Sequence, residues 1–264
     1  MRFVLLIFGL LFFGFANPIY GQNRTTNFQF EKMVDTEMKG HSTISFTENQ
    51  NTQNYDVTYY QLYLEVDPSS TYIIGKVTIS FIPNQDLTEI HFDLTDSLQI
   101  DSISYNGQQL VFLHVANQIS ISHAFTGSVL DSLSIYYHGN PPSNSSAFTT
   151  GTHNGTPILW TLSEPYGAMD WWPCKQSLTD KADSLDVFVT APAGNKVAGN
   201  GVLISETMIS SQSTLTHWKC RYPIVPYLVA IAVTPYAEIS FQSQLRQGNL
   251  FVQSHIFNAM VTTV

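Results

Sequence analysis

The stretch of sequence that decides the fold runs from Val57 to Phe81 and reads VTYYQLYLEVDPSSTYIIGKVTISF. From Tyr60 to Val66 apolar and polar residues alternate, which is the period of two expected of a strand with one buried face. Asp67 to Ser70 supplies a turn, and Gly75 to Ile82 alternates again. The stretch therefore predicts an antiparallel β-hairpin.

The same alternation continues along the chain. Asn106-Gly107 is its strongest short hairpin signal, and strand-like segments recur about every ten residues, as in an all-β sandwich. Gly139 to Thr156 is a loop by composition, because Pro, Ser, Asn, Thr and Gly dominate it. Long helical patterns are nearly absent. The sequence predicts an all-β, antiparallel β-sandwich with strands at Ile90–Leu94, Ile100–Tyr105, Val111–Val115, Gln118–Ser122, Leu133–Tyr137, Ser184–Thr190, Leu203–Ile209, Thr214–Arg221 and Tyr227–Val233.

Composition and charge exclude several classes of partner. The 264 residues include only 11 Lys and Arg, carry a net charge of -9 and contain no basic run. This balance argues against nucleic acid or an anionic membrane as a partner. The hydrophobic fraction of 44% is ordinary for a globular chain and allows a packed core.

The amino terminus has the pattern of a signal peptide. Met1 and Arg2 precede the apolar run Phe3–Ala16, which is short for a membrane span; an uncleaved anchor is the alternative. We expect residues 1–21 to be a signal peptide and the mature protein to be secreted or periplasmic, without a membrane partner after cleavage. Residues 22–54 form a polar lead-in arm, with a short helix expected near Phe30–Lys39.

The chain contains two cysteines, Cys174 and Cys220. In an oxidising compartment they could form a disulfide, which would stabilise the fold by roughly 4 kcal/mol in the chain-entropy model. Two buried, unpaired thiols are the alternative, because sequence alone does not place the two Cα atoms.

A second stretch resembles a known family. Trp160 to Asp186 reads WTLSEPYGAMDWWPCKQSLTDKADSLD and is similar to the pattern T-Q-x-E/Q-x-x-x-A-R-x-x-F-P-C-x-D-x-P-x-x-K-A of the aminopeptidase N family of zinc metallo-aminopeptidases (gluzincins of the membrane alanyl aminopeptidase type). The Val57–Phe81 hairpin and Tyr222–Ala230 resemble two further family segments. The positions of the Trp160–Asp186 stretch that fall into register are Thr161, Glu164, Ala168, Pro173, Cys174, Lys181 and Ala182.

The resemblance implies a fold and a place in a larger enzyme. Residues 55–238 correspond to the saddle-shaped amino-terminal β domain of the family, which packs beside a thermolysin-like catalytic domain and caps one side of its cleft. Residues 239–264 are then the start of the connection to a missing catalytic domain. Gln176-Ser177-Leu178 and Met169 depart from the family pattern, which has acidic residues and an arginine at these places.

The resemblance also assigns Glu164 a role. In the family the corresponding Glu or Gln reaches into the catalytic cleft and helps to bind the free α-amino group of the peptide substrate. An ammonium group in a partly desolvated pocket needs carboxylates to offset its lost hydration. The alternative is an idle, exposed turn residue before Pro165.

The residues that would bind zinc and cut peptides are not found in the sequence. None of the eight histidines begins the H-E-x-x-H pattern that places two imidazoles and a general base on one helix face. We therefore expect no cofactor in this chain, no activity of the chain alone, and zinc in the catalytic domain of the parent enzyme. A stand-alone secreted β-sandwich that binds proteins or glycans is the rival hypothesis, because fold does not specify function.

Two smaller expectations concern the Trp160–Asp186 stretch. Trp171 and Trp172 could line a substrate-facing surface, but aromatic pairs in β domains more often pack in the core. Asp180 and Lys181 are expected to form a local ion pair.

Overall fold

The computed structural model describes residues 48–245 and 248–257, all of which fall in one compact unit, residues 47–264. The expected signal peptide, the helix near Phe30–Lys39 and most of the lead-in arm lie outside the described residues. Within the described part, helical structure is confined to three short 3-10 turns, and no helix there could cross a bilayer. The turns are η1 (Gln50–Thr52), η2 (Ala168–Asp170) and η3 (Pro226–Leu228).

The predicted hairpin forms strands β1 (Tyr55–Val66) and β2 (Ile73–Pro83), which pair in antiparallel register. Buried and exposed residues alternate along both strands. In the turn between them, the Asp67 carboxylate accepts a hydrogen bond from the Ser69 backbone N–H at 2.8 Å. The structure thus confirms the hairpin.

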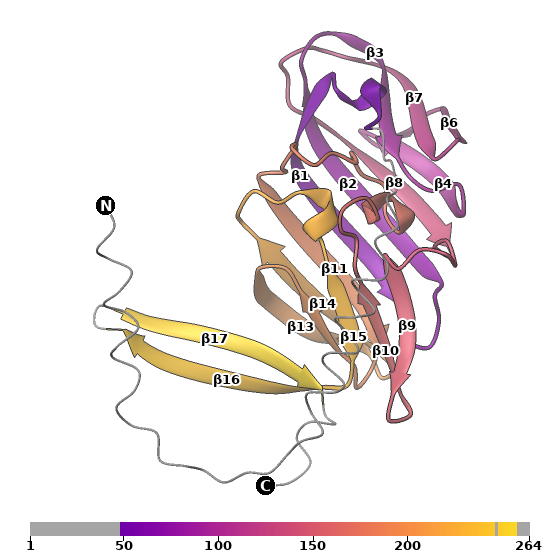
Figure 1. Cartoon of the computed structure of the whole chain (residues 1–264). Coiled ribbons are helices and arrows are strands. Elements are labelled where there is room, and N and C mark those ends of the chain that lie inside the picture. The colour runs from indigo at the N-terminus through magenta and orange to yellow at the C-terminus, as the bar shows by residue number, and fades with distance from the viewer. Residues whose placement is uncertain (1–47, 246–247, 258–264) are drawn as a thin grey trace, which may run out of the picture. The chain divides into compact units, whose positions relative to one another are not determined.

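An eight-stranded sheet is built around this hairpin, in the order β13-β14-β11-β1-β2-β8-β4-β5 (Figure 1). Its pairs are antiparallel except β1 and β11, which run parallel, with Leu62 opposite Val187. The other six strands are β4 (Leu98–Tyr105), β5 (Gln108–Gln109), β8 (Asp131–Gly139), β11 (Ser184–Pro192), β13 (Val202–Ser210) and β14 (Ser213–Cys220).

The Asn106-Gly107 turn connects β4 to β5. Both residues have positive φ, 49° and 79°, as a two-residue type I′ hairpin turn requires. The structure thus confirms the hairpin turn predicted at Asn106-Gly107, although β5 pairs with β4 over only two residues.

Two smaller sheets and a hairpin complete the fold. One sheet has the order β12-β15-β10-β9 and the other β3-β7-β6, and β16 pairs only with β17 among the described strands. Strand β9 lies inside the segment expected to be a loop, so that prediction is wrong for residues 148–153. The strands are β3 (Leu87–Asp93), β6 (Phe112–Val115), β7 (Gln118–Phe125), β9 (Phe148–His153), β10 (Thr156–Thr161), β12 (Lys196–Gly199), β15 (Ile231–Thr234), β16 (Tyr236–Leu245) and β17 (Gly248–Phe257).

The core lies between the inner face of the large sheet and these smaller elements. Trp218 of β14 donates its indole N–H to the carbonyl of Val197 in β12 at 2.9 Å. The Tyr137 hydroxyl of β8 donates to the carbonyl of Trp171 at 2.9 Å. Buried residues of all three packed sheets form one apolar cluster, so the described fold is an all-β sandwich, as predicted.

Residues 48–54 contact the body of the domain. Thr52 is buried, the Asn49 side chain donates to the Asp93 carboxylate at 2.8 Å, and the Asn51 side chain donates to Gln118 at 3.3 Å. This end of the lead-in segment is therefore held against β3 and β7.

Candidate functional site

The candidate site is the segment that leaves the small sheet at the end of β10. The hydroxyl of Thr161 accepts a hydrogen bond from the backbone N–H of Ile231 at 2.9 Å, which ties β10 to β15. One residue further, Leu162 donates its backbone N–H to the carbonyl of Ala147 at 3.0 Å. The chain is thus fixed on both sides as it leaves the sheet.

Ser163 anchors the next turn. Its hydroxyl accepts a hydrogen bond from the indole N–H of Trp171 at 2.9 Å, and its carbonyl accepts one from the backbone N–H of Gly167 at 2.8 Å. A Cβ on Gly167 would lie 2.7 Å from the Cβ of Ala147, which is too close for any other residue without movement. Glycine therefore permits the tight path around residue 164.

Glu164 projects from this anchored turn. Its side chain is exposed, and its carboxylate has no hydrogen bond or ion pair with the residues that the structure describes. Trp160 and Leu162 are also exposed, at 36% and 39%, whereas Thr161 and Ser163 are buried. Glu164 thus follows the exposed Leu162 by two residues, on the segment just after β10 (Thr156–Thr161), and its carboxylate is free to bind a cation.

The tryptophan pair belongs to the core. Trp171 and Trp172 are both 0% exposed. Their ring centroids are 6.0 Å apart, and Trp172 packs edge-on against Tyr60 at 4.9 Å. The packing role is confirmed for both, and neither lines an exposed surface.

Cys174 and Cys220 are both buried and are not joined by a disulfide in the structure. The Cys174 thiol lies 3.6 Å from the amide oxygen of Gln176, and the Cys220 thiol lies 3.5 Å from the carbonyl of Tyr222. Burial raises the pKa of the Cys174 thiol well above its usual value, and Asp93 and Asp170 raise it further. Cys174 is therefore a neutral thiol with little nucleophilic character.

Gln176 occupies one of the positions that departs from the family pattern. Its backbone N–H donates to the Asp93 carboxylate at 2.8 Å, and its side-chain oxygen accepts from the backbone N–H of Met169 at 3.2 Å. Burial raises the pKa of Asp93, although the hydrogen bonds from Asn49 and Gln176 oppose that rise. A neutral amide at position 176 avoids placing a second carboxylate beside Asp93.

Lys175 and Asp180 form a buried ion pair that the sequence analysis missed. Only 6% of the Lys175 side chain and 9% of the Asp180 side chain are exposed. The Lys175 ammonium also donates to the carbonyl of Tyr55 at 2.6 Å. Asp180 was expected to pair with Lys181, which is exposed instead. The pair fixes the end of the segment that carries Glu164.

Residues 48–245 and 248–257 also bear on metal binding. Among them, no group of three or more His, Cys, Asp or Glu side chains is arranged to hold a metal ion. The residues present here therefore do not fit a zinc site.

A polar cluster on the outer face of the large sheet surrounds Asp186. Its carboxylate, 4% exposed, lies 2.5 Å from His217 Nε2 and accepts hydrogen bonds from Lys219 at 2.7 Å and Tyr59 at 2.8 Å. Burial alone would raise the pKa of Asp186, but the hydrogen bonds from Lys219, His217 and Tyr59 outweigh it, so the pKa is lowered.

This lowered pKa predicts how stability depends on pH. The folded-state pKa of Asp186 lies below the unfolded value of about 3.9. Its contribution is therefore present above about pH 4 and is lost as the pH falls through the folded pKa. We expect the difference in free energy of unfolding between the wild type and Asp186→Asn to shrink in this range, as measured by urea unfolding at a series of pH values. A difference that stays constant down to about pH 2 would contradict the assignment.

Known proteins share this fold and sequence pattern. The family model of the Peptidase M1 N-terminal domain matches residues 56–228. No curated protein sequence matches the chain. The crystal structure of the M1 zinc metallopeptidase from Deinococcus radiodurans is similar, with a TM-score of 0.68 and 25% sequence identity over 80% of this chain and 50% of that chain.

Two further solved structures share the fold. A mutant of the Deinococcus radiodurans enzyme bound to a Tyr-Ser-Ala substrate has a TM-score of 0.68 and 24% identity over 80% of this chain and 50% of that chain. A mutant two-domain M1 zinc metallopeptidase bound to L-arginine has a TM-score of 0.67 and 24% identity over 78% of this chain and 48% of that chain. The chain thus spans about half the length of the solved structures it matches.

Proposed function

The chain belongs to the Peptidase M1 N-terminal domain family, and we propose from this that it is the non-catalytic amino-terminal domain of an exported zinc aminopeptidase. Residues 55–238 cap one side of the cleft of a catalytic domain, and residues 239–264 begin the connection to it. The observation that carries this proposal is Glu164, an exposed carboxylate without a partner among the described residues, on a turn whose neighbours are fixed by hydrogen bonds.

Glu164 contributes to recognition of the peptide amino terminus. The α-amino group of a peptide has a pKa of about 7.7–8.0 and is largely protonated near neutral pH. When this ammonium group enters a partly desolvated cleft, a carboxylate offsets its lost hydration. The nitrogen of an internal residue belongs to an uncharged amide bond and carries no such charge. The contact with Glu164 therefore restricts cutting to the first residue.

The parent enzyme supplies the remaining chemistry from outside this chain. Zinc and the general base belong to the catalytic domain, since the described residues here do not fit a metal site. Trp160 in β10 and Leu162 just after it are exposed close to Glu164 in the chain, and they provide apolar surface that the catalytic domain covers. The signal-peptide pattern of residues 1–21 supports secretion or a periplasmic location.

The genomic sequence beyond the codon for Val264 tests the proposal. A frame that encodes an H-E-x-x-H helix, and whose joined product releases amino-terminal residues from peptides, is the expected result. An unrelated gene after an intergenic region would overturn the proposal and favour a stand-alone secreted β-sandwich module.

The purified chain alone should be inactive. Residues 22–264 should bind no zinc at stoichiometric level and should not hydrolyse aminoacyl chromogenic substrates, because ligands and base are expected in the other domain. Metal analysis and a chromogenic assay check this expectation. Metal-dependent release of an amino-terminal residue by pure material would contradict it.

A further inference from the structure

A shallow hollow of about 390 Å³ lies at one end of the large sheet. The β1–β2 turn and the β13–β14 turn flank it, and residues at the ends of β1, β2 and β11 line it. Its volume falls at the lower end of the range of small-ligand sites, about 300–1,000 Å³. The lining residues that matter here are Glu65, Asp67, Tyr72, Ile74, Thr190 and Gln212.

Three polar side chains of the hollow have no hydrogen-bond or ion-pair partner among the described residues. They are the Glu65 carboxylate, the Thr190 hydroxyl and the Gln212 amide. Glu65 and Thr190 are direct neighbours across the β1–β11 pair. The hollow therefore presents an acceptor, a hydroxyl and an amide from three separate chain segments, all available to a ligand.

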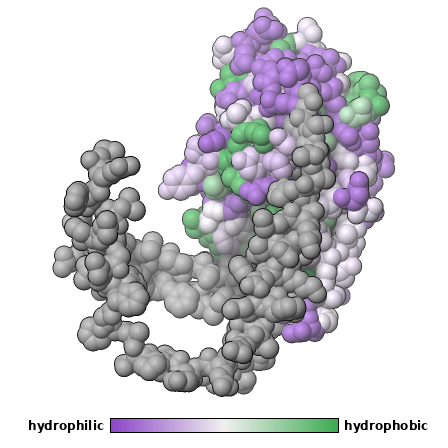
Figure 2. Space-filling view, in the orientation of Figure 1, coloured by the Kyte–Doolittle hydropathy of each residue, from purple (hydrophilic) through white to green (hydrophobic). Residues whose placement is uncertain are grey.

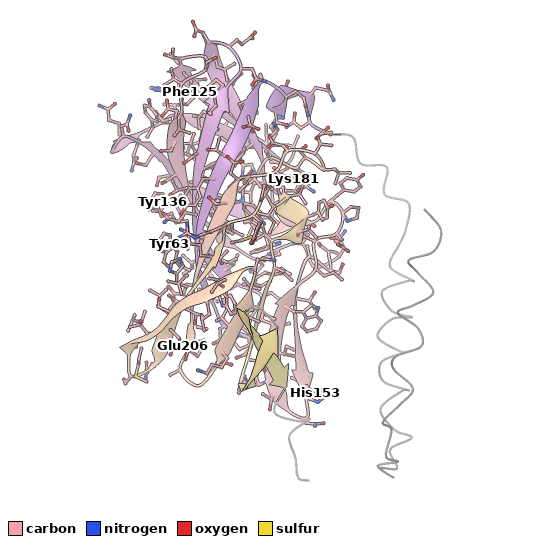
Figure 3. The ribbon with its side chains drawn as sticks, turned by 90° about the vertical axis from the view of Figure 1, so that its left-hand side faces the viewer. Tyr63, Phe125, Tyr136, His153, Lys181 and Glu206 are labelled. Atoms are coloured by element: carbon pink, nitrogen blue, oxygen red, sulfur yellow. The ribbon has the colours of Figure 1, made fainter. Side chains whose placement is uncertain are left out.

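Apolar surface adjoins these polar groups. Tyr72 and Ile74 line the hollow and are 42% and 46% exposed, and Ile74 lies opposite Glu65 across the β1–β2 pair. Tyr63 and Tyr136, each 37% exposed, extend the same face of the sheet. Figure 3 shows Tyr63 and Tyr136 together on one side of the molecule, away from Lys181 of the Glu164 segment.

We propose that this hollow binds a neutral saccharide. Sugar hydroxyls can donate to the Glu65 carboxylate and exchange hydrogen bonds with Gln212 and Thr190, while the C–H faces of a sugar ring pack on Tyr72 and Ile74. Among the described residues that line the hollow there is no Lys, Arg or His. The nearby Lys76 ammonium lies over the rings of Tyr63 and Tyr136, 5.6 and 5.5 Å from their centroids, and is not part of the lining. The hollow itself therefore offers no cation to an anionic ligand. A basic peptide is the less suitable occupant, because two of the three polar groups without a partner are neutral and the Asp67 carboxylate already caps its own turn.

Binding is measured with residues 22–264 and needs no catalytic domain, so it is independent of the proposed peptidase role. The probes are cellohexaose, maltohexaose, mannohexaose and chitohexaose, followed by calorimetry and by NMR shifts of the hollow residues. At least one saccharide should shift those residues. Tyr72→Ala and Glu65→Gln should each weaken its binding about tenfold or more, the scale of one lost contact.

The control is Leu113→Ala, which truncates a side chain that is 61% exposed on β6. Hydrophobic residues of β6 are visible as a separate patch in Figure 2. This variant should bind the saccharide as the wild type does, and all variants should keep the wild-type melting temperature. Two results would overturn the proposal: no saccharide of the panel shifts the hollow residues, or hexalysine binds there and the saccharides do not.

Discussion

Replacing Glu164 by alanine in the full-length parent enzyme should lower kcat/KM for peptides with a free amino terminus by roughly 2–4 kcal/mol, or about 30- to 800-fold. The reason is the loss of a charge-assisted contact to the substrate ammonium in a partly desolvated cleft. Steady-state kinetics on aminoacyl substrates measures the effect.

Two variants separate charge recognition from a general disturbance. Glu164→Gln keeps an oxygen acceptor but removes the charge, so its kcat/KM should fall between the wild type and Glu164→Ala. Glu89→Ala removes a half-exposed carboxylate of β3 and should leave kcat/KM unchanged. If Glu164→Ala retains full activity, Glu164 is only an exposed turn residue and the proposed contact does not exist.

The sequence predicts the hairpin and the fold class because both depend on local signals. Alternation along β1 and β2 is a consequence of one buried face, and it is visible in the residues themselves. The parallel pairing of β1 with β11 is different. Leu62 and Val187 lie far apart in the chain, and local periodicity carries no information about which distant strand becomes a neighbour.

Strand β9 shows a second limit of sequence reasoning. Its sequence, Phe148–His153, contains Thr, Gly and His between two loop-like stretches, so composition favours a loop. The structure makes it a strand because β10 pairs with it along six residues, with Thr156 opposite His153. Tertiary pairing here overrides weak local propensity.

The candidate site was predictable only in part. Glu164 was found through the family pattern, and its exposure on an anchored turn could not be derived from residue spacing. The sequence predicts an ion pair between Asp180 and its neighbour Lys181. The structure instead buries Lys175, whose ammonium donates to the carbonyl of Tyr55 in β1 and forms an ion pair with the Asp180 carboxylate. A buried ammonium group requires such a counter-charge to offset its lost hydration.

This buried pair is the basis of the largest stability effect that we expect. Lys175→Met should lower the free energy of unfolding by about 3–5 kcal/mol. The substitution leaves the Asp180 carboxylate buried without its counter-charge. One oxygen of that carboxylate has no hydrogen-bond partner, and the other accepts a long contact, 3.4 Å, from the backbone N–H of Val57 besides Lys175. The neighbouring Asp56 carboxyl also interacts with Asp180, and it brings no positive charge. Urea unfolding of the full chain measures the change.

Two comparisons decide whether burial is the cause. Lys196→Met breaks the ion pair with Glu206, in which 34% and 29% of the side chains are exposed, and should cost about 1 kcal/mol or less because solvent screens it. The double variant Lys175→Met/Asp180→Leu should recover much of the lost stability, because it removes the orphaned charge as well. Equal losses in the single and double variants would mean that Lys175 acts through its contacts with Tyr55, whose carbonyl accepts a hydrogen bond from the ammonium at 2.6 Å and whose ring centroid lies 4.8 Å from it. The ion pair with Asp180 would then not be what stabilises the segment that carries Glu164.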